Sequence, residues 1–355
     1  MTLVLENVVK MDGQETHIHE TNIELKEQGF NILLGATLAG KTTLMQLMAG
    51  IQRPTSGKIW FNGEDVTGRP VQKRNISMVY QQFINYPNMS VYENIASPLR
   101  VARLPSAEIK KRVGSMAELL KLEPMLQRRP SELSGGQQQR TALARALVKD
   151  SSLVLLDEPL ANLDYKLREE LREELPNLLA DRQTTIVYAT TEPTEALLLG
   201  GHTATMREGS ITQYDKTSLV YRHPADLQTA KVFSDPPINT ANIVKRNDRL
   251  ILGDKIDWHV PATFQNVPDG DYIIGVRPHH VLPTSVQADL VEVSGTVLVT
   301  ELSGSESTAH FDLEGNIWVS LSSGIQAFKV GDSQEFHINL EKAMFFSSSG
   351  ELIAS

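Results

Sequence analysis

A lysine and a threonine that follow two glycines at fixed spacing are the first residues of this chain that could do chemistry. Gly35 through Thr42 fits the pattern Gly, four residues, Gly, Lys, then Ser or Thr. Backbone N–H groups of such a loop and the positive end of the next helix converge on phosphate. Lys41 would reach the β- and γ-phosphates of a nucleotide, and Thr42 would ligate Mg²⁺. The alternative is a chance match on a glycine-rich turn.

One residue of this loop is unusual. Leu38 stands where phosphate-binding loops of this kind often carry glycine, and its side chain limits backbone freedom. We therefore expect nucleotide binding to survive with weakened affinity. The residues expected to surround the phosphates are Gly35, Ala36, Thr37, Leu38, Ala39, Gly40, Lys41, Thr42 and Thr43.

Two adjacent carboxylates are the second chemical feature. Residues 153–159 read LVLLDEP, an apolar run that ends in an acidic pair. Asp157, at the strand end, suits indirect ligation of Mg²⁺, and Glu158 suits polarisation of an attacking water. The same pair could instead form a helix-capping turn.

A third feature lies just upstream, in ELSGGQQQRTALARALVKD at residues 132–150. A serine and two glycines before a helix make a second anion-binding end. A simple capped helix explains the serine and one glycine, but not the whole pentapeptide or its distance from LVLLDEP. The pentapeptide is Leu133-Ser134-Gly135-Gly136-Gln137, and the helical apolar positions are Ala142, Leu143, Ala146 and Leu147.

These features need strands and helices to position them. Phe30–Leu34 is a short apolar strand before the phosphate loop, and Leu44, Leu47 and Met48 recur after it at helical spacing. Strand, loop and helix in this order are the context that the motif requires. The sequence therefore predicts an α/β fold around the loop.

Composition restricts the classes of function. A chain of 355 residues suits two domains. Its net charge of −9 argues against a non-specific nucleic-acid binder, and the lack of cysteine excludes disulfides and thiol chemistry. The N-terminus does not look like a secretory signal, and no run approaches the roughly 18 apolar residues of a membrane span. A membrane role would have to come through partners.

The pattern of the amino-acid sequence changes after about residue 236. Short β-like runs follow, separated by Gly, Asp, Asn and Ser turns, and they predict a small β-barrel or sandwich.

Earlier in the chain, His17 and His19 share one face of a strand-like run. Without further ligands nearby, we do not expect them to bind a metal.

Taken together, the motifs resemble those of ATP-binding-cassette (ABC) ATPases, and more narrowly the ATPase subunits of carbohydrate and polyol importers for maltose, glycerol phosphate and glycerol. Residues 79–99 are similar to the segment with the family's Q-loop glutamine, here Gln81, and residues 161–175 to its D-loop, with Asp164 as the aspartate. The resemblance implies an ABC-type domain at 1–236, with a P-loop α/β core, an antiparallel β subdomain and a helical subdomain at about 83–150. It implies an oligosaccharide-binding-like barrel at 237–355 for dimerisation and regulation.

The resemblance also implies a mechanism. Family members form head-to-tail dimers in which each ATP lies between the phosphate loop of one subunit and the LSGGQ of the other. Gln81, Asp157 and Glu158 would serve this chain's own ATP and Mg²⁺, with Gln81 also a metal ligand. The partner's nucleotide would meet Ser134, Gly135, Gly136 and Gln137. Implied partners are two membrane permease subunits and, indirectly, a periplasmic or extracellular binding protein, with the chain peripheral at the cytoplasmic face of the inner membrane.

Three positions depart from the family pattern. Thr191 stands where the family has its switch histidine, and a hydroxyl cannot carry that positive charge. Asp12 stands where an aromatic ring stacks on adenine, and Leu38 is the third departure. All three belong to the chain's own ATP site, whereas LSGGQ is intact. We therefore expect a second, different ATPase as partner and a poorly hydrolytic own site. Because bacterial glycerol importers similar to this chain pair two unlike ATPases, the resemblance implies glycerol or a related polyol as cargo.

Several alternatives stay open. The chain could form a homodimer with full activity at both sites, serving a sugar or glycerol-phosphate importer. It could instead be a mainly structural or regulatory subunit, a reading that Lys41, Glu158 and the intact LSGGQ oppose. A cassette ATPase of DNA repair or translation is a further rival, but those proteins carry tandem cassettes or long coiled-coil inserts, and this chain has neither.

Overall fold

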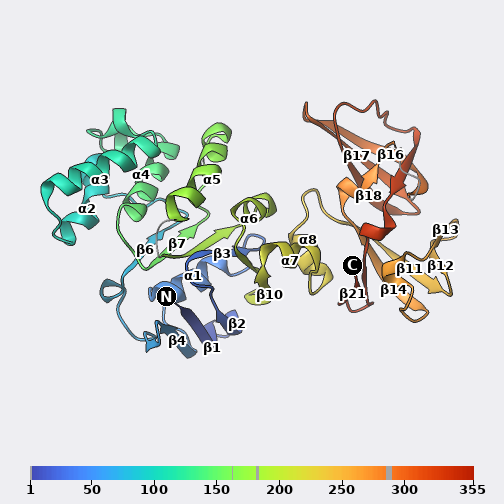
Figure 1. Ribbon diagram of the computed structural model, residues 1–355, viewed down its shortest axis with the longest axis horizontal. Coiled ribbons are helices and arrows are strands. Elements are labelled where there is room, and N and C mark those ends of the chain that lie inside the picture. The colour runs from blue at the N-terminus through green and yellow to red at the C-terminus, as the bar shows by residue number, and fades with distance from the viewer. Residues whose placement is uncertain (1, 162, 181–183, 285–289) are drawn as a thin grey trace. The chain divides into compact units, whose positions relative to one another are not determined.

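The computed structural model describes residues 2–161, 163–180, 184–284 and 290–355. The chain divides into two compact units, Met1–Thr217 and Ser218–Ser355 (Figure 1). This division falls earlier than residue 236, where the composition changes. Helix α8 (Leu227–Val232) lies in the second unit, where the backbone N–H of Leu227 donates to the carbonyl of Gly350 at 2.8 Å.

A six-stranded sheet forms the centre of the first unit. Its strand order is β10-β9-β3-β8-β7-β6, and all neighbours are parallel except the edge strand β10. Every residue of β7 and β8 is buried, as expected for central parallel strands covered on both faces. The strands are β3 (Gly29–Leu34), β6 (Ile76–Val79), β7 (Leu153–Asp157), β8 (Thr185–Thr190), β9 (His202–Arg207) and β10 (Ser210–Lys216).

A second, antiparallel sheet has the order β2-β1-β4-β5. Helix α1 (Lys41–Ala49) contributes Leu44, Met45 and Leu47 to a buried core that also includes residues of both sheets. The phosphate loop is thereby fixed between two sheets. The strands are β1 (Leu3–Asp12), β2 (Glu15–Glu24), β4 (Ser56–Phe61) and β5 (Glu64–Asp65).

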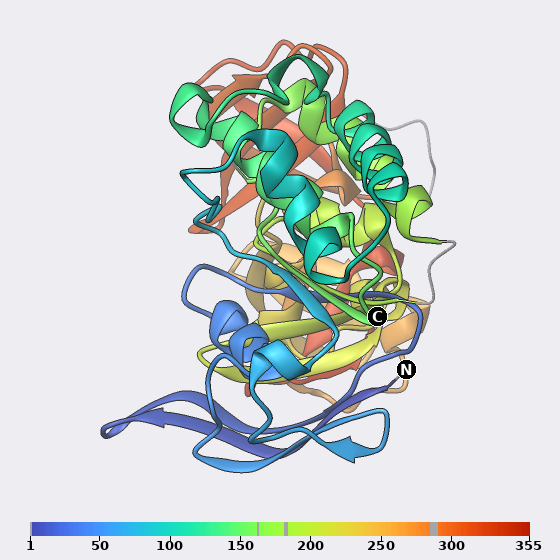
Figure 2. The same cartoon turned by 90° about the vertical axis from the view of Figure 1, so that its left-hand side faces the viewer.

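A helical segment lies on the opposite side of the six-stranded sheet from this antiparallel sheet (Figures 1 and 2). Ser90 and Ser134 each begin a helix with a reciprocal capping box, which satisfies the free N–H groups there. No helix among the described residues has both the length and the apolar composition needed to cross a membrane. The helical segment contains α2 (Val91–Val101), α3 (Ser106–Leu119) and α4 (Gly135–Leu147), with 3-10 turns at Glu123–Met125 and Pro130–Glu132. Outside it, the first unit has α5 (Tyr165–Ala180), α6 (Pro193–Leu199) and a 3-10 turn at Val71–Lys73.

The second unit consists of two antiparallel sheets around one core. Phe311 stacks on Phe336 with ring centroids 3.9 Å apart, and Phe264 stacks on Phe345 at 4.1 Å. The expectation of a C-terminal β-barrel-like unit is confirmed. Before its strands come α7 (Thr217–Arg222) and α8, and 3-10 turns lie at Ala262–Phe264, Pro278–His280 and Leu340–Lys342.

One sheet of this unit has the order β13-β12-β11-β14-β20-β21, and the other has the order β15-β19-β16-β17-β18. The first sheet comprises β11 (Asn239–Arg246), β12 (Arg249–Leu252), β13 (Ile256–His259), β14 (Gly270–Val276), β20 (Met344–Phe346) and β21 (Leu352–Ala354). The second comprises β15 (Val281–Leu282), β16 (Val291–Leu302), β17 (Glu306–Leu313), β18 (Asn316–Ser323) and β19 (Ser333–Ile338).

Candidate nucleotide site

The phosphate loop lies between β3 and the first turn of α1. Lys41 is the first residue of the helix, and its ammonium donates to the carbonyl oxygens of Gly35 at 2.7 Å and Ala36 at 3.0 Å. The side chain is only 5% exposed, and burial lowers the pKa of Lys41 while the nearby Glu158 carboxylate opposes that shift. The lysine is therefore held inside the loop, beside the free N–H groups of the helix end.

Leu38 occupies the left-handed backbone region, with a φ of 68°. Its side chain is 94% exposed, so no packing compensates for this conformation. A residue with a β-carbon costs about 1–2 kcal/mol there, whereas glycine does not. The structure thus gives a physical reason for the glycine preference that the sequence analysis noted at this position.

Thr42 and Asp157 meet at the carboxyl end of β7. The Thr42 hydroxyl donates to Asp157 Oδ2 at 2.8 Å, and Asp157 Oδ1 is buried without a protein partner. Burial raises the pKa of Asp157, while the Thr42 hydroxyl counteracts the rise. An unpaired carboxylate oxygen beside a threonine hydroxyl is the hard oxygen donor set that Mg²⁺ prefers. These residues therefore fit the expected metal.

Glu158 links the loop to Gln81. Its Oε1 lies 3.4 Å from Lys41 Nζ, and its Oε2 accepts a hydrogen bond from Gln81 Nε2 at 3.0 Å. The backbone of Glu158 has a φ of 46°, an uncommon conformation for a residue with a side chain. Such strain is often found at functional sites. Residues from three distant stretches, Lys41, Gln81 and Glu158, are thus brought into direct contact.

These residues line a cleft of about 500 Å³. One wall of the cleft, formed by strand β2 and the turn after β9, was not predicted from the sequence. The only available signal was the alternation in THIHET, which placed two histidines on one face without indicating what that face meets. The cleft is lined by Glu15, Thr16, His17, His19, Thr37, Leu38, Ala39, Gly40, Lys41, Thr42, Thr43, Gln81, Glu158, Glu208 and Gly209.

The LSGGQ segment does not reach this cleft within the chain. Ser134 caps helix α4: its hydroxyl accepts from the backbone of Gln137 at 3.4 Å, and the Gln137 side chain accepts from the backbone of Ser134 at 3.0 Å. A β-carbon at Gly135 would meet no atom within 4 Å, so this helix end is open. Gly136 completes the turn. The segment is therefore available to another molecule.

Asp164 and Thr191 also lie outside the residues that line the cleft. The Asp164 carboxylate accepts from the backbone of Leu167 at 3.1 Å and so caps the start of α5. Thr191 is exposed in the turn after β8. At the expected aromatic position, Asp12 is exposed at the end of β1, paired with Glu15 across the β1–β2 hairpin.

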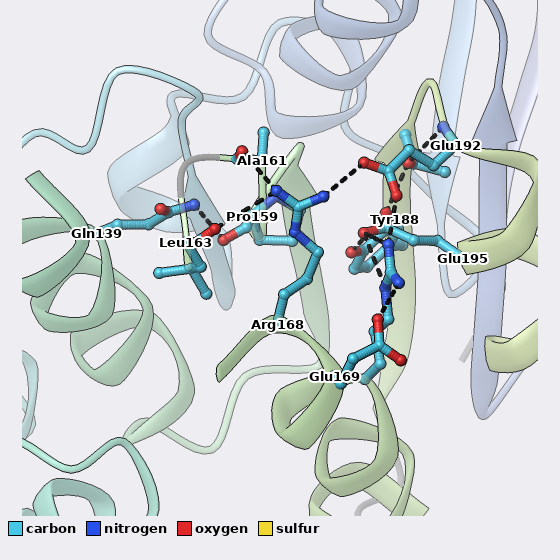
Figure 3. Close-up of polar contacts among 11 residues, drawn as sticks. Gln139, Pro159, Ala161, Leu163, Arg168, Glu169, Tyr188, Glu192 and Glu195 are labelled. Carbon is cyan, nitrogen blue, oxygen red and sulfur yellow. Dashed lines mark hydrogen bonds and ion pairs between the residues drawn. The ribbon is translucent and has the colours of Figure 1, made fainter. Parts of the chain in front are cut away.

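Two arginines of α5 join the loops around this site (Figure 3). Arg168 donates to the carbonyl of Ala161 at 3.1 Å and of Leu163 at 3.4 Å, and to Glu192 at 3.0 Å. Arg172, only 8% exposed, also pairs with Glu192. The loop after Glu158 and the turn at Thr191 are thereby tied to one helix.

A buried carboxylate anchors the other end of this network. Glu195 accepts from Arg172 at 3.2 Å, Tyr188 at 3.0 Å and Thr190 at 2.6 Å (Figure 3). Burial alone would lower the pKa of Arg172, but Glu195 and the neighbouring carboxylates raise it. Burial also raises the pKa of Tyr188. On the opposite side, Gln139 of α4 donates to the carbonyl of Pro159, next to Glu158.

Comparison with known proteins agrees with this architecture. A family profile described as ABC transporter matches residues 18–161. The chain is 27% identical to the ABC cassette MJ0796 in a dimeric post-hydrolysis state bound to ADP and Pi, with a TM-score of 0.56; the match covers 61% of this chain and 98% of that one.

Relatives that match over most of the chain are named for different transported substrates. The trehalose/maltose import ATP-binding protein MalK of Thermococcus litoralis is 34% identical, covering 94% of this chain and 96% of that protein. The osmoprotective compounds uptake ATP-binding protein GgtA of Synechocystis is 33% identical, covering 98% and 97%. The Fe(3+) ions import ATP-binding protein FbpC of Photobacterium profundum is 39% identical, covering 80% of each. The expected ABC-type α/β fold is confirmed, and the chain belongs to the family of ABC transporter ATP-binding proteins.

Proposed function

We propose that this chain is the ATP-binding subunit of an importer that couples ATP binding and hydrolysis to uptake of a polyol or sugar, with glycerol preferred. The ATPase part of this proposal is supported by the convergence of four residues at one cleft, namely Lys41, Thr42, Gln81 and Glu158. Asp157 lies beside them and accepts a hydrogen bond from Thr42. The names of the relatives include import of trehalose or maltose, osmoprotective compounds and iron. These names support import. The preference for a polyol rests instead on the unlike pair of ATPases that the departures from the family pattern at Asp12, Leu38 and Thr191 imply.

The residues that meet around Glu158 each have a role in this proposal. Lys41, once it leaves the carbonyls of Gly35 and Ala36, holds the β- and γ-phosphates. Glu158 polarises the attacking water, and Gln81 orients the Glu158 carboxylate through their hydrogen bond. Bound Mg²⁺, held by Thr42, Gln81 and Asp157, would neutralise charge on the phosphates.

The second ATPase is part of the proposal because the LSGGQ segment is open and intact, whereas the own site departs from the family. Ser134, Gly135, Gly136 and Gln137 would bind the nucleotide of a different, complete ATPase, and Asp164 would lie near the same junction. At the own site, Thr191 offers no imidazole and Leu38 strains the loop. The own site would then bind ATP and hydrolyse it slowly.

A homodimer with two active sites is the second candidate. The contact of Glu158 with both Lys41 and Gln81 favours it, because the groups that polarise water and bind phosphate are already in place. A mainly structural subunit fits less well, since such a chain would have no need for this arrangement.

The permease subunits would dock on the helical segment. A groove of about 460 Å³ lies there, lined by Pro98 and Val101 of α2 and by Arg145 of α4, among others. The Arg145 guanidinium stacks over the ring of Tyr86 at 4.8 Å, also in this groove. Val101 is 85% exposed, so an apolar side chain is free to meet a partner. The chain would lie peripherally at the cytoplasmic face of the membrane, and the binding protein would act indirectly through the permeases.

The C-terminal unit would serve dimerisation and regulation. Within this unit, Arg277 holds the segment around α7 and α8: the guanidinium lies 3.7 Å from the ring of Tyr221 and donates to the carbonyls of Tyr221 and Phe233.

The test is to purify the assembled complex from membranes through a tag on this chain, and to count its ATPase polypeptides. One copy beside one different cassette protein supports the asymmetric importer. Two copies of this chain alone would favour the homodimer. A tagged chain that recovers no membrane protein and hydrolyses no ATP would refute the proposal.

A further inference from the structure

Two hydroxyl groups of strand β8 share one carboxylate oxygen. Tyr188 and Thr190 are two residues apart, so their side chains lie on the same face of the strand. Both donate hydrogen bonds to Glu195 Oε2, at 3.0 Å and 2.6 Å respectively (Figure 3). All three side chains are buried. Because Arg172 pairs with the other oxygen, Oε1, at 3.2 Å, this buried carboxylate is paired through both of its oxygens.

The two hydroxyl groups differ in what they accept. Thr190 Oγ1 also accepts a hydrogen bond at 3.0 Å from the backbone N–H of Glu192, in the turn after the strand. Among the described residues, the hydroxyl of Tyr188 has Glu195 as its one hydrogen-bond partner. A hydroxyl group can donate and accept at once, and of these two only that of Thr190 does both. Thr190 therefore connects the buried carboxylate to the turn that carries Thr191.

The same end of β8 supports two parts of the nucleotide site. The backbone N–H of Gly35, at the start of the phosphate loop, donates to the carbonyl of Thr190 at 3.4 Å. The backbone N–H of Glu158 donates to the carbonyl of Ala189 at 3.0 Å. Glu158 has a backbone φ of 46°, a conformation that persists only where neighbouring groups hold it. A shift of the last two residues of β8 would thus displace the phosphate loop and the Glu158 carboxylate together.

Thr190 is not among the residues that line the nucleotide cleft, so it would act through other residues. We infer that Thr190 is a positioning residue of this chain's own ATP site. Its hydroxyl fixes the end of β8 and the following turn to Glu195. That attachment keeps Gly35 and Glu158 in place for hydrolysis. The inference rests on the proposed ATP hydrolysis and adds a residue outside the motifs identified in the sequence. Glu195 is the poorer residue to substitute, because its loss would leave the buried Arg172 guanidinium short of a partner.

The experiment uses the assembled complex, purified through a tag on this chain. Vanadate trapping of labelled nucleotide on this chain measures hydrolysis at its own site, and labelling with a non-hydrolysable ATP analogue measures binding there. Thr190→Val keeps the branched shape and removes the hydroxyl. We expect it to slow trapping about 10- to 100-fold while weakening analogue binding by less than a factor of about three, because small displacements of reacting groups affect rate in this way. Thr190→Ala serves the same purpose if the valine variant does not assemble.

Two further variants separate positioning from general stabilisation. Thr190→Ser keeps the hydroxyl and should retain most of the trapping rate. Tyr188→Phe removes the other donor to the same Glu195 oxygen and should leave trapping unchanged. Urea titration should nevertheless show a lower midpoint of unfolding for Tyr188→Phe as well as for Thr190→Val, since each loses a buried hydrogen bond.

Several results would overturn the inference while ATP binding stands. Equal losses of trapping in Thr190→Val and Tyr188→Phe would assign the effect to the stability of the carboxylate network. Equal losses in Thr190→Val and Thr190→Ser would assign it to side-chain packing rather than to the hydroxyl. An unchanged rate in Thr190→Val, or a wild-type chain that binds the analogue but traps no nucleotide, would leave Thr190 without a role in hydrolysis. A wild-type chain that neither binds the analogue nor traps nucleotide would refute the proposed function, and the inference with it.

Discussion

Arg168 connects the backbone after Glu158 to the turn that carries Thr191. One guanidinium nitrogen lies 3.1 Å from the carbonyl oxygen of Ala161, and another lies 3.0 Å from Glu192 Oε1. Charge-assisted hydrogen bonds of this kind are stronger than neutral ones. The turn that carries Thr191 is thus held by this pair and by the buried Glu195, which accepts a hydrogen bond from Thr190.

We predict that Arg168→Met lowers kcat at this chain's own ATP site about 10- to 100-fold and changes KM little, because small displacements of catalytic groups have effects of this size. The ATPase rate of the whole complex should fall less, since the partner's site is the faster one. Glu192→Gln should act in the same direction. In the double variant the two effects should be clearly less than additive, since the residues form one interaction. Steady-state ATPase kinetics measure all three, and vanadate trapping of labelled nucleotide on this chain assigns the loss to its own site.

Glu170→Gln is the matched control for these variants. Glu170 lies on the same helix α5 and pairs with the exposed Lys121. Its substitution should leave kcat unchanged, because exposed ion pairs contribute little. A loss of kcat in Glu170→Gln equal to that in Arg168→Met would mean that α5 as a whole, rather than the Arg168 contacts, is responsible.

Leu38→Gly should stabilise the chain. The left-handed conformation at φ 68° costs a leucine about 1–2 kcal/mol, while glycine's greater freedom in the unfolded chain offsets part of the gain. The free energy of unfolding should rise by about 0.5–1 kcal/mol in urea titrations. Leu38→Ala, which keeps a β-carbon, should show no such rise. A lower stability in Leu38→Gly would show that the backbone strain is absent in solution.

Thr191→His tests the asymmetric importer directly. With two unlike sites, the histidine restores a proton-carrying group to the slow one, and the ATPase rate of the complex should rise by at most about twofold. Vanadate trapping of labelled nucleotide should also become more even between the two ATPase chains. Thr194→His, on the exposed side of α6, is the control. An unchanged rate with trapping that was already symmetric would contradict the proposal.

Ser134→Ala should impair turnover more than Glu158→Gln, because Ser134 would serve the faster site and Glu158 the slower one. Ser134 also caps helix α4, and losing a cap costs about 1 kcal/mol. Ser90→Ala removes an equivalent capping box from α2 and controls for that loss. Equal ATPase losses in the Ser134 and Glu158 variants, measured on the complex, would indicate two equivalent sites.

The sequence predicted those parts of the site that lie within one continuous stretch. Gly35–Thr43 could be recognised because strand, loop and helix follow one another, and LVLLDEP because a buried strand ends in charge. The family resemblance, rather than any local pattern, predicted that Gln81 and Glu158 serve one nucleotide, and the structure adds the hydrogen bond between them. The wall that β2 contributes could not be predicted, since it depends on how distant elements pack. The alternation around His17 predicted a strand face but gave no sign of the cleft beside it. Residue 236 marks a change in composition, whereas the compact units divide between Thr217 and Ser218, because α8 already belongs to the C-terminal unit.

His280 should make the C-terminal unit sensitive to acid. Burial, together with the neighbouring His279, Arg277 and Lys342, lowers the pKa of His280 to about 4, and its Nδ1 is buried without a protein partner. The unfolded chain, with an ordinary pKa near 6.5, binds more protons than the folded one between these values. The stability due to the neutral ring is therefore complete above about pH 6.5 and is lost as the pH falls toward 4.

We expect this loss to be about 1–2 kcal/mol, reduced by solvent screening because the ring is only partly buried. Urea unfolding at pH 7 and pH 4.5 measures it in a Trp60→Phe background, where the buried Trp258 and Trp318 report on the C-terminal unit. His280→Gln should reduce the difference between the two pH values, because a neutral amide does not titrate. His259→Gln, whose parent side chain is 79% exposed, should leave the difference unchanged. If His280→Gln kept the full acid sensitivity, the proton uptake would have to occur at other groups, and the buried imidazole would not limit the stability of this unit.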